Sequence, residues 1–500
     1  MIFLGIDCGT QSTKVAALDW ETGEILASEG DSYGFIEGLP PGAMEQDPAW
    51  WTAAAEKGIR AVATKLGSRA AEIAGIGVSG QQHGLVPVDR DGNVIRPAKL
   101  WCDTSTTAEC AEITAALGGD AEVISLTGNT MRAGYTAPKI RWLHKNEPAN
   151  YERAATFLLP HDYLNFWLTG EARMEYGDAS GTALLDIESR TWSGPACAAT
   201  APGLADRLPK PGPSSAACGF LKSELASRWG LPGRVLVSAG GGDNMMAAIG
   251  TGNVAKGCIT ASLGTSGTLF AFSETPVADP MGEIAGFCDS TDHWLPLLCT
   301  MNLTLVTEHV RKLFGWSHAD MDAAIASVPP GADGLRMLPY LTGERTPDLP
   351  NATGVLAGMT LANFQPARLA RASVEAVVLG LAYGLGRLRD LGVPADEIRL
   401  TGGASESPVW RQICADAFGL PVVCLDSSKG AALGAAIQAG WTHASHASKG
   451  GAVCLGLLCE RLVPLASARR SDPAPAAHAV YQSMLEETRR LRGAMEPFLA

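Results

Sequence analysis

Ser238-Ala239-Gly240-Gly241-Gly242-Asp243-Asn244 is the stretch around which this chain is organised. The apolar run before it, residues 235–237, predicts a buried strand, and the small residues after it predict a helix. The three glycines allow bare backbone to approach a ligand, and the carboxylate of Asp243 follows them directly. This arrangement suits a general base that acts on a hydroxyl beside a phosphate. The alternative is a glycine turn in which Asp243 only caps a helix.

Length and charge limit the classes of protein to consider. A chain of 500 residues is too long for one core, so we expect two or three domains. The net charge is −13, and the basic residues form no runs, which argues against nucleic acid or an anionic membrane as a partner. A phosphate ligand stays open, because glycine-rich backbone and helix N-termini bind anions locally.

The cysteines and the amino terminus indicate the compartment. The 12 cysteines form no CxxC pair, which argues against a zinc site and favours a reducing compartment. The first residues, Met1 to Ile6, are followed by Asp7 and lack a basic segment, unlike a signal peptide. With no run of about 18 apolar residues, we expect no membrane span and a cytoplasmic protein.

Two similar hairpins stand half a chain apart. Residues 2–6 and 14–18 predict strands joined by a turn that contains Gly9 and Thr10. Residues 258–262 and 268–272 repeat the pattern, with Gly264 and Thr265 at the tip. Such tips can offer N–H groups and hydroxyls to phosphate oxygens. The repetition favours two related domains that face one ligand.

Aligning the two hairpin tips places Asp7 opposite Ser262. Only the first hairpin therefore carries a carboxylate suited to a metal ion. Taken alone, this hairpin would be read as structural, and the second copy shifts the balance toward function.

Two short segments carry candidates for sugar binding. Gln82 and His83 follow the strand predicted over residues 73–78, and Trp101 stands close to Asp103. An aromatic ring beside an acceptor suits a sugar, which has an apolar face and a hydroxyl edge. The alternatives are a structural histidine and a buried tryptophan beside a turn aspartate.

Two common nucleotide-binding motifs can be excluded, and one glycine-containing turn remains as a candidate nucleotide-binding segment. Gly75-Ile76-Gly77-Val78-Ser79-Gly80 matches GxGxxG, but no helix follows at once, as a dinucleotide site requires, and GxxxxGK[ST] is absent. The segment 398–418 instead predicts a strand, the glycine pair Gly402-Gly403, and a helix that begins after Ser407. This order suits a nucleotide phosphate or base.

Taken together, these segments resemble the FGGY family of carbohydrate kinases, in family order and over nearly the whole chain. The segments that carry the resemblance are Gly5–Thr10, Ser79–Gly84, Leu100–Asp103, Gly240–Asn244, Ser262–Ser266, Leu341–Pro347 and Gly402–Ala404. The resemblance implies an α/β fold of two actin-like (ribonuclease H-like) domains with a central ligand cleft. The domains would cover residues 1–245, with the sugar and the base, and 246–500, with the nucleotide.

The resemblance also implies roles for the residues, with ATP and Mg²⁺ as cofactors. Asp243 would take the proton from the terminal hydroxyl of a ketose, and Asp7 with Asp243 would hold Mg²⁺. The implied sugar-binding residues are Gln82, His83, Trp101, Asp103, Asp243 and Asn244. The implied nucleotide- and phosphate-binding residues are Gly9, Thr10, Gly264, Thr265, Gly402, Gly403 and Ser407.

The turn at Gln82-His83 is most like the members that phosphorylate D-xylulose to D-xylulose 5-phosphate. Many relatives carry an arginine two residues after the equivalent of Asp103, and Ser105 stands there instead. We interpret this as variation within the subgroup that affects the detailed sugar contacts. A kinase for ribulose, gluconate or glycerol stays open as an alternative, as does an actin-like ATPase switch that takes no sugar. The oligomeric state is also open, with a homodimer as one alternative.

Overall fold

The computed structural model describes residues 1–425, 430–447 and 453–499. The chain forms two compact units, which are not continuous in sequence. Unit 1 comprises Met1–Ala255, Phe272–Leu295 and Lys429–Pro464, and unit 2 comprises Lys256–Ala271, Pro296–Ser428 and Leu465–Ala500. The expected division into 1–245 and 246–500 differs from these units, because two later segments return to unit 1. As a division into functional domains it stays a prediction.

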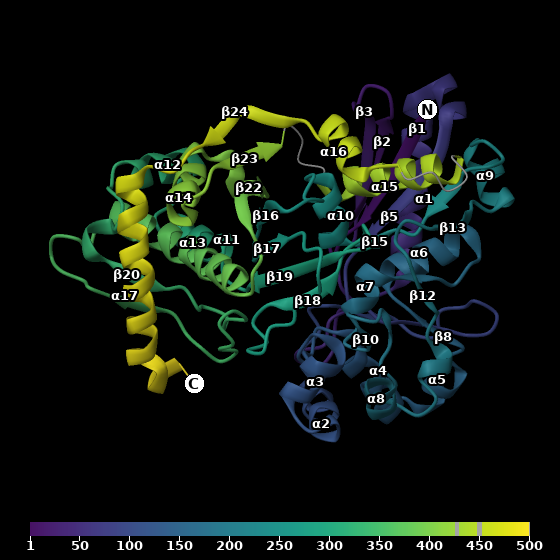
Figure 1. Ribbon diagram of the computed structural model, residues 1–500, viewed down its shortest axis with the longest axis horizontal. Helices are drawn as coiled ribbons and strands as arrows, with labels where there is room; N and C mark the ends of the chain where they lie inside the picture. The colour runs from purple at the N-terminus through teal and green to yellow at the C-terminus, as the bar shows by residue number, and fades with distance from the viewer. Residues whose placement is uncertain (426–429, 448–452, 500) are drawn as a thin grey trace. The chain divides into compact units, whose positions relative to one another are not determined.

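The sheet of unit 1 has the strand order β13-β14-β5-β1-β2-β3, with β15 beside β5. The predicted first hairpin is β1 and β2, and β3 extends it to an antiparallel meander, while β5 runs parallel to β1 and β14 parallel to β5. Figure 1 shows β1, β2, β3 and β5 side by side. The strands are β1 (Ile2–Cys8), β2 (Ser12–Asp19), β3 (Ile25–Ser32), β5 (Ile73–Gly80), β13 (Ala217–Phe220), β14 (Leu236–Ser238) and β15 (Gly241–Gly242).

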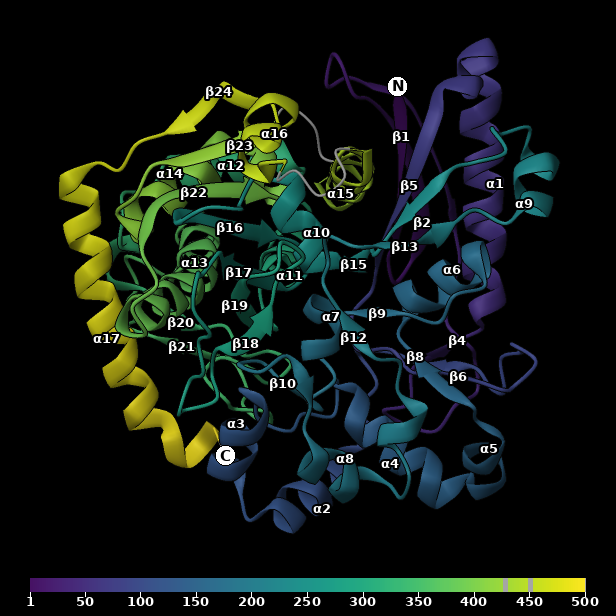
Figure 2. The same cartoon turned by 45° about the vertical axis from the view of Figure 1, so that its right-hand side comes forward.

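Helices α1 (Pro48–Leu66) and α15 (Gly430–Ala447) cover opposite faces of this sheet (Figure 2). Asp47 caps α1 by accepting a hydrogen bond from the Ala49 N–H at 2.9 Å, as its sequence predicts. On the other face, a Cβ at Gly77 would lie 2.0 Å from the carbonyl oxygen of Ala435 in α15. Gly77 is therefore needed for the packing of α15 on the sheet. This role agrees with the conclusion that the GxGxxG match at 75–80 is not a dinucleotide-binding motif.

The remaining elements of unit 1 are short and surround this core. The strands are β4 (Glu45–Gln46), β6 (Val86–Val88), β7 (Ala98–Lys99), β8 (Thr156–Leu158), β9 (Met174–Glu175), β10 (Leu185–Asp186), β11 (Thr191–Trp192), β12 (Pro211–Gly212) and β18 (Ala285–Cys288). The helices are α2 (Thr107–Leu117), α3 (Asp120–Thr127), α4 (Thr136–Asn146), α5 (Pro148–Arg153), α6 (Pro160–Thr169), α7 (Tyr176–Ser180), α8 (Gly194–Thr200), α9 (Ser223–Trp229), α10 (Asp243–Gly250) and α16 (Leu455–Leu462).

Unit 2 repeats this plan with the strand order β19-β17-β16-β22-β23-β24. The predicted second hairpin is confirmed as β16 and β17, and β22 runs parallel to β16 as β5 does to β1. The strands are β16 (Gly257–Leu263), β17 (Gly267–Ala271), β19 (Trp294–Thr300), β22 (Ala395–Thr401), β23 (Val422–Leu425) and β24 (Leu465–Ser471), with a separate pair β20 (Arg336–Leu338) and β21 (Val355–Ala357). The helices are α11 (Thr304–Leu313), α12 (His318–Ala326), α13 (Pro366–Asp390), α14 (Pro408–Phe418) and α17 (Pro475–Leu499).

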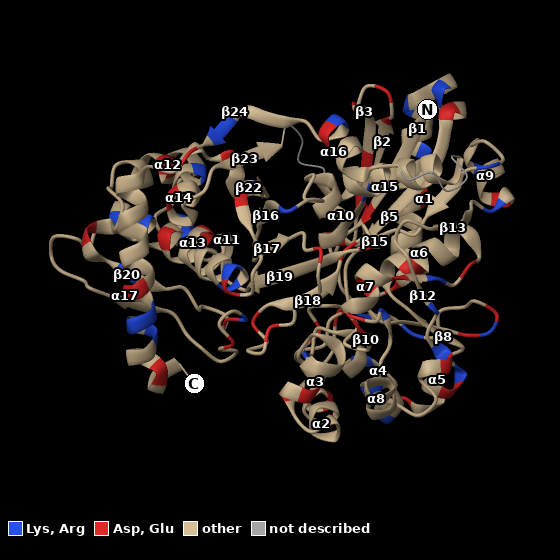
Figure 3. Cartoon of the chain, viewed as in Figure 1, with Lys and Arg blue, Asp and Glu red and all other residues tan. Residues whose placement is uncertain are grey.

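Helix α13 is the central helix of unit 2. Within the described ranges it is the one helix long and apolar enough to cross a membrane, but 78% of its most apolar window is buried inside the protein. Arg371 in α13 donates to Tyr481 of α17 at 2.7 Å, which ties the terminal helix to this core. Helix α17 carries acidic and basic residues intermixed along its length, as the red and blue segments of Figure 3 show.

Candidate active site

Asp243 is the first residue of α10, directly after β15. The turn before it passes through Gly240 at φ +72°, a conformation that favours glycine. The buried Gln438 of α15 holds this turn, because its Oε1 accepts from Ser238 Oγ at 2.8 Å and from the Gly240 N–H at 2.9 Å. Its Nε2 donates to the Gly240 carbonyl at 2.9 Å. The entry of the chain into α10 is thus fixed by a residue about 200 positions later in the sequence.

The carboxyl of Asp243 has an unusual proton affinity. Burial, together with the negative charges of Asp7 and Asp178, raises its pKa to about 7. The N–H of Asn244 donates to Asp243 Oδ1 at 2.8 Å and opposes this shift. A carboxylate with a pKa near neutral can both accept and release a proton at physiological pH, as a general base must.

Asp7 lies on β1, between Lys14 of β2 and Ser79 of β5. Ser79 Oγ donates to Asp7 Oδ1 at 3.2 Å, and burial nevertheless raises the pKa of Asp7. Because the charge of Asp7 also raises the pKa of Asp243, a divalent cation would relieve the repulsion between them. The described residues contain no group of three or more His, Cys, Asp or Glu that could hold a metal. A pair of carboxylates still fits Mg²⁺, which takes one or two carboxylates together with substrate phosphates.

The turn after β5 brings two predicted sugar-binding residues to α10. Asn244 Nδ2 donates to Gln82 Oε1 at 2.8 Å and to Asp243 Oδ1 at 3.1 Å. Burial raises the pKa of Asp178, and its contacts with His161 and with the amide of Gln82 oppose this shift. Asp178 Oδ2 lies 2.7 Å from His161 Nδ1. Gln82, Asn244 and Asp243 therefore form one polar cluster, supported from behind by a buried Asp–His pair.

That supporting pair carries no motif in the sequence. His161 and Asp178 have no exposed surface, and the carboxylates around His161 raise its pKa well above the usual value. A Cβ at Gly80 would lie 2.7 Å from His161 N and 2.8 Å from His161 Cβ, so the start of α6 packs directly against the end of β5. In the sequence, this pair could have been noticed only because each of its titratable side chains stands in a segment that is otherwise largely apolar.

Trp101 was predicted to bind the sugar and Thr10 to bind phosphate, and the structure shows a hydrogen bond between these two residues. Trp101 Nε1 donates to Thr10 Oγ1 at 2.9 Å, which links the loop after β7 to the first hairpin tip. The tip itself is closed by the Gly9 N–H, which donates to the Ser12 carbonyl at 3.0 Å. The predicted sugar-binding and phosphate-binding segments of unit 1 are therefore neighbours.

Asp103 lies behind this surface, with no exposure. Its Oδ2 accepts from Lys99 Nζ at 3.0 Å and from the Met44 N–H at 2.9 Å, and its Oδ1 accepts from Ser105 Oγ at 2.6 Å. Both carboxylate oxygens are thus used within the chain, and the geometry favours the structural alternative over a direct sugar contact. Ser105, which stands where many relatives carry arginine, completes this cluster.

Unit 2 contains a pocket of about 680 Å³, a size that suits a nucleotide. Among the predicted nucleotide-binding residues, Gly264, Thr265, Gly403 and Ser407 line it, and Gly402 does not. Gly402 is required for packing instead, since its φ is +86° and a Cβ there would lie 2.5 Å from the Leu263 carbonyl oxygen. The register of β16 with β22 pairs Ser262 with Thr401, which brings the hairpin tip beside the glycine pair.

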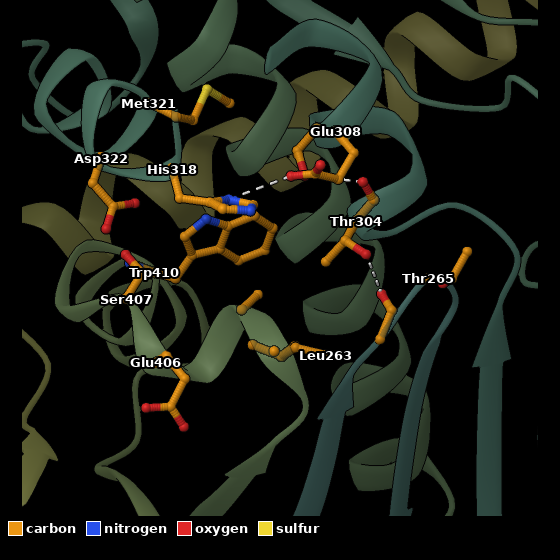
Figure 4. A pocket seen from close by; sticks show the side chains of 14 residues that line it. Leu263, Thr265, Thr304, Glu308, His318, Met321, Asp322, Glu406, Ser407 and Trp410 are labelled. Carbon is orange, nitrogen blue, oxygen red and sulfur yellow. Dashed lines mark hydrogen bonds and ion pairs between the residues drawn. The ribbon is translucent and has the colours of Figure 1, made fainter. Parts of the chain in front are cut away.

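Helices α11 and α12 supply the opposite wall, which the sequence did not indicate. Thr304 Oγ1 donates to the Gly264 carbonyl at 2.8 Å, and His318 Nδ1 lies 3.5 Å from Glu308 Oε1 (Figure 4). The buried indole of Trp410 lines the pocket from α14. The hydroxyl of Ser407 accepts from the Trp410 N–H at 3.3 Å, so it also caps that helix.

Comparison with known proteins agrees with this arrangement. Residues 2–250 match the N-terminal domain, and residues 259–443 the C-terminal domain, of the FGGY family of carbohydrate kinases. The chain belongs to this family. The actin-like, two-domain α/β fold class is thereby confirmed, and membership of a kinase family implies the use of ATP.

Individual relatives of this FGGY kinase match over nearly their whole length. A xylulose kinase of Haemophilus influenzae is 38% identical over 97% of this chain and 98% of its own. A xylulose kinase of Escherichia coli K12 is 34% identical over 100% of both chains. The crystal structure of a "xyloylose kinase" from Brucella ovis is 31% identical, covers 100% of both chains and superposes with a TM-score of 0.92.

Proposed function

We propose that this kinase transfers the γ-phosphoryl group of ATP to the terminal hydroxyl of D-xylulose, giving D-xylulose 5-phosphate and ADP. The observation that carries the proposal is the position of Asp243, at the start of α10 and joined through Asn244 to Gln82. The curated relatives are named xylulose kinases, which supports xylulose as the sugar.

The reaction requires the protein to accept the proton that the sugar hydroxyl releases. As the O5 hydroxyl attacks the γ-phosphorus, its O–H bond breaks and the proton passes to the carboxylate of Asp243. The new O–P bond forms as the bond from the γ-phosphorus to the bridging oxygen breaks, and ADP leaves. Because burial raises the pKa of Asp243 to about 7, the carboxylate is basic enough for this transfer.

The phosphates have candidate binding groups in both units. In unit 1 these are the backbone of Gly9 and the tip around Thr10, and in unit 2 the tip at Gly264-Thr265, which lines the pocket. Asp7 and Asp243 would hold Mg²⁺, which neutralises phosphate charge when bound. The pocket between α11, α12 and α14 would take the remainder of the nucleotide.

The test is a coupled assay of ADP release with Mg-ATP and a panel of acceptors: D-xylulose, L-ribulose, D-ribulose, gluconate and glycerol. We expect kcat/KM to be highest for D-xylulose. A preference for another acceptor would keep the kinase and contradict the sugar. ADP release that no acceptor stimulates would contradict the transfer itself and favour an ATPase switch.

The expected cytoplasmic location and the homodimer remain predictions. Sedimentation equilibrium of the purified protein measures the oligomeric state directly, and a single species with the mass of one chain would contradict the dimer.

A further inference from the structure

Lys139 in helix α4 is a lysine with no exposed surface. Its Nζ donates to the carbonyl oxygens of His83 at 3.1 Å, Tyr135 at 2.9 Å and Gly134. An ammonium group has three N–H donors and no acceptor, so these three carbonyls match its full capacity. One side chain therefore joins the turn after β5 to the segment that precedes α4.

The carbonyl of His83 belongs to a backbone that needs such support. His83 has φ +64°, in the left-handed region that side chains other than glycine rarely adopt. Thr136 Oγ1 also donates to the His83 carbonyl, at 3.2 Å. These two donors hold a turn whose conformation decides where the His83 side chain points.

The His83 ring is placed by the same surroundings. It packs edge-on against Tyr135, with ring centroids 4.8 Å apart, and lies 5.6 Å from Phe287. A Cβ at Gly181 would lie 2.4 Å from His83 Cε1, so only glycine leaves room for this ring. Lys139 thus binds the backbone of both partners in the His83–Tyr135 contact.

Burying the charge of Lys139 costs free energy, which argues against a purely structural role for this side chain. Burial lowers the pKa of its ammonium to about 7. The charged and titratable groups that act on it are Asp103, Cys102 and Cys110, which favour the ammonium, and Lys99, which disfavours it. Two further charged groups, Arg132 and Glu109, act on the pKa of Cys110 and so also belong to the surroundings of Lys139. A methionine would fill the same space without this penalty.

We propose that Lys139 is a positioning residue of the sugar site, where its ammonium holds the His83 turn against Tyr135 in the orientation that binds the ketose. The inference rests on the proposed function and deepens it, because His83 is one of the residues proposed to contact the sugar. When Lys139 loses its proton, two N–H donors remain for three carbonyls, and the turn loosens. The affinity for the sugar then falls above neutral pH, while the nucleotide pocket of unit 2 is untouched.

The variant that tests this is Lys139→Met, with Lys145→Met as its matched control. Lys145 lies on the same helix, but it is partly exposed and pairs with Glu109 and Glu112. For each protein, KM for the sugar, KM for ATP and kcat are measured from pH 6 to pH 9, with the melting temperature as a check on folding.

At pH 6.5 we expect Lys139→Met to raise the sugar KM about tenfold or more, since hydrogen bonds from a charged donor contribute about 1.5–3 kcal/mol. The ATP KM should stay within about twofold, and Lys145→Met should behave as the natural protein does. In the natural protein the sugar KM should rise above pH 7, whereas in Lys139→Met it should not change with pH in this range.

A sugar KM of Lys139→Met equal to that of the natural protein, or an equal rise in both KM values, overturns the inference. If the variant does not fold, the natural protein decides alone, and a sugar KM that is constant from pH 6 to pH 9 overturns it. Failure of the proposed function looks different, because the natural protein then shows no turnover of D-xylulose. The same comparison is in that case made with the acceptor that the panel identifies.

Discussion

Asn244 Nδ2 donates a hydrogen bond to Gln82 Oε1 at 2.8 Å, and so joins the start of α10 to the turn that follows β5. The two residues are 162 positions apart. The same amide donates to Asp243 Oδ1 at 3.1 Å, so the candidate base and the candidate sugar ligand share one donor group.

A double-mutant cycle measures this coupling. We expect Gln82→Ala and Asn244→Ala each to lower kcat/KM for the sugar, and the double variant to lose less than the product of the two effects. Residues in one hydrogen-bond network couple by about 0.5–3 kcal/mol. Strictly multiplicative effects on kcat/KM would show that the bond has no role in the reaction.

Asp243→Asn removes the proposed base and keeps the size of the side chain. General-base catalysis contributes about 10²–10⁴-fold, so kcat should fall by that amount while the protein melts near its normal temperature. Asp91→Asn, at an exposed turn of unit 1, is the matched control and should leave kcat unchanged. A turnover of Asp243→Asn close to that of the natural protein would remove Asp243 from the base role.

The dependence of the rate on pH follows from the pKa of Asp243. Its active form is the carboxylate, and with a pKa of about 7 this form is lost as pH falls through neutrality. Below the inflection, kcat/KM should fall about tenfold for each pH unit. Because the charge of Asp178 raises this pKa, Asp178→Asn should move the inflection to lower pH. A profile that is flat from pH 5.5 to pH 8 would contradict the assignment.

His83→Ala removes the ring that packs against Tyr135 and Phe287. We expect the KM for D-xylulose to rise far more than the KM for ATP, because the pocket that would hold the nucleotide is lined by unit 2 alone. Steady-state kinetics with each substrate varied in turn measure both constants. Sugar kinetics that do not change would return His83 to a structural role.

Gly403→Val tests the pocket of unit 2. A Cβ at Gly403 meets nothing within 4 Å, so the substitution adds bulk at the pocket wall and leaves the protein packing intact. The KM for ATP should rise at least about tenfold, since overfilling a close contact costs about 1–3 kcal/mol. Gly233→Val, in an exposed loop of unit 1 with equally open space, is the control and should not change it. Equal effects of the two variants would place the nucleotide elsewhere.

The sequence predicted the local elements of the fold well, because each was encoded in neighbouring residues. Both hairpins, and the helix expected after Ser407, lie where apolar runs and turn residues indicated them. The order of the short motifs along the chain was enough to carry the family resemblance.

The candidate site was predicted less evenly, because burial and hydrogen bonds across the chain are not visible in one sequence. Asp103 looked like a sugar ligand, and the structure shows both of its oxygens bonded to Lys99, Met44 and Ser105. Gly402 looked like a nucleotide contact, and it lies under the hairpin tip. The wall formed by α11 and α12 carried no motif at all.

By itself, the sequence determined the two glycine-rich hairpins, the carboxylate after the glycine turn and the family to which the chain belongs, since these depend on residues that are close together in the chain. Only the tertiary structure decided which polar groups from distant segments bond to the residues of the candidate site. Gln438 fixes the turn before Asp243, and Lys139 holds the carbonyl of His83. The physical reason is that orientation and proton affinity are set by burial and by partners about 50 to 200 positions away, which no local pattern records.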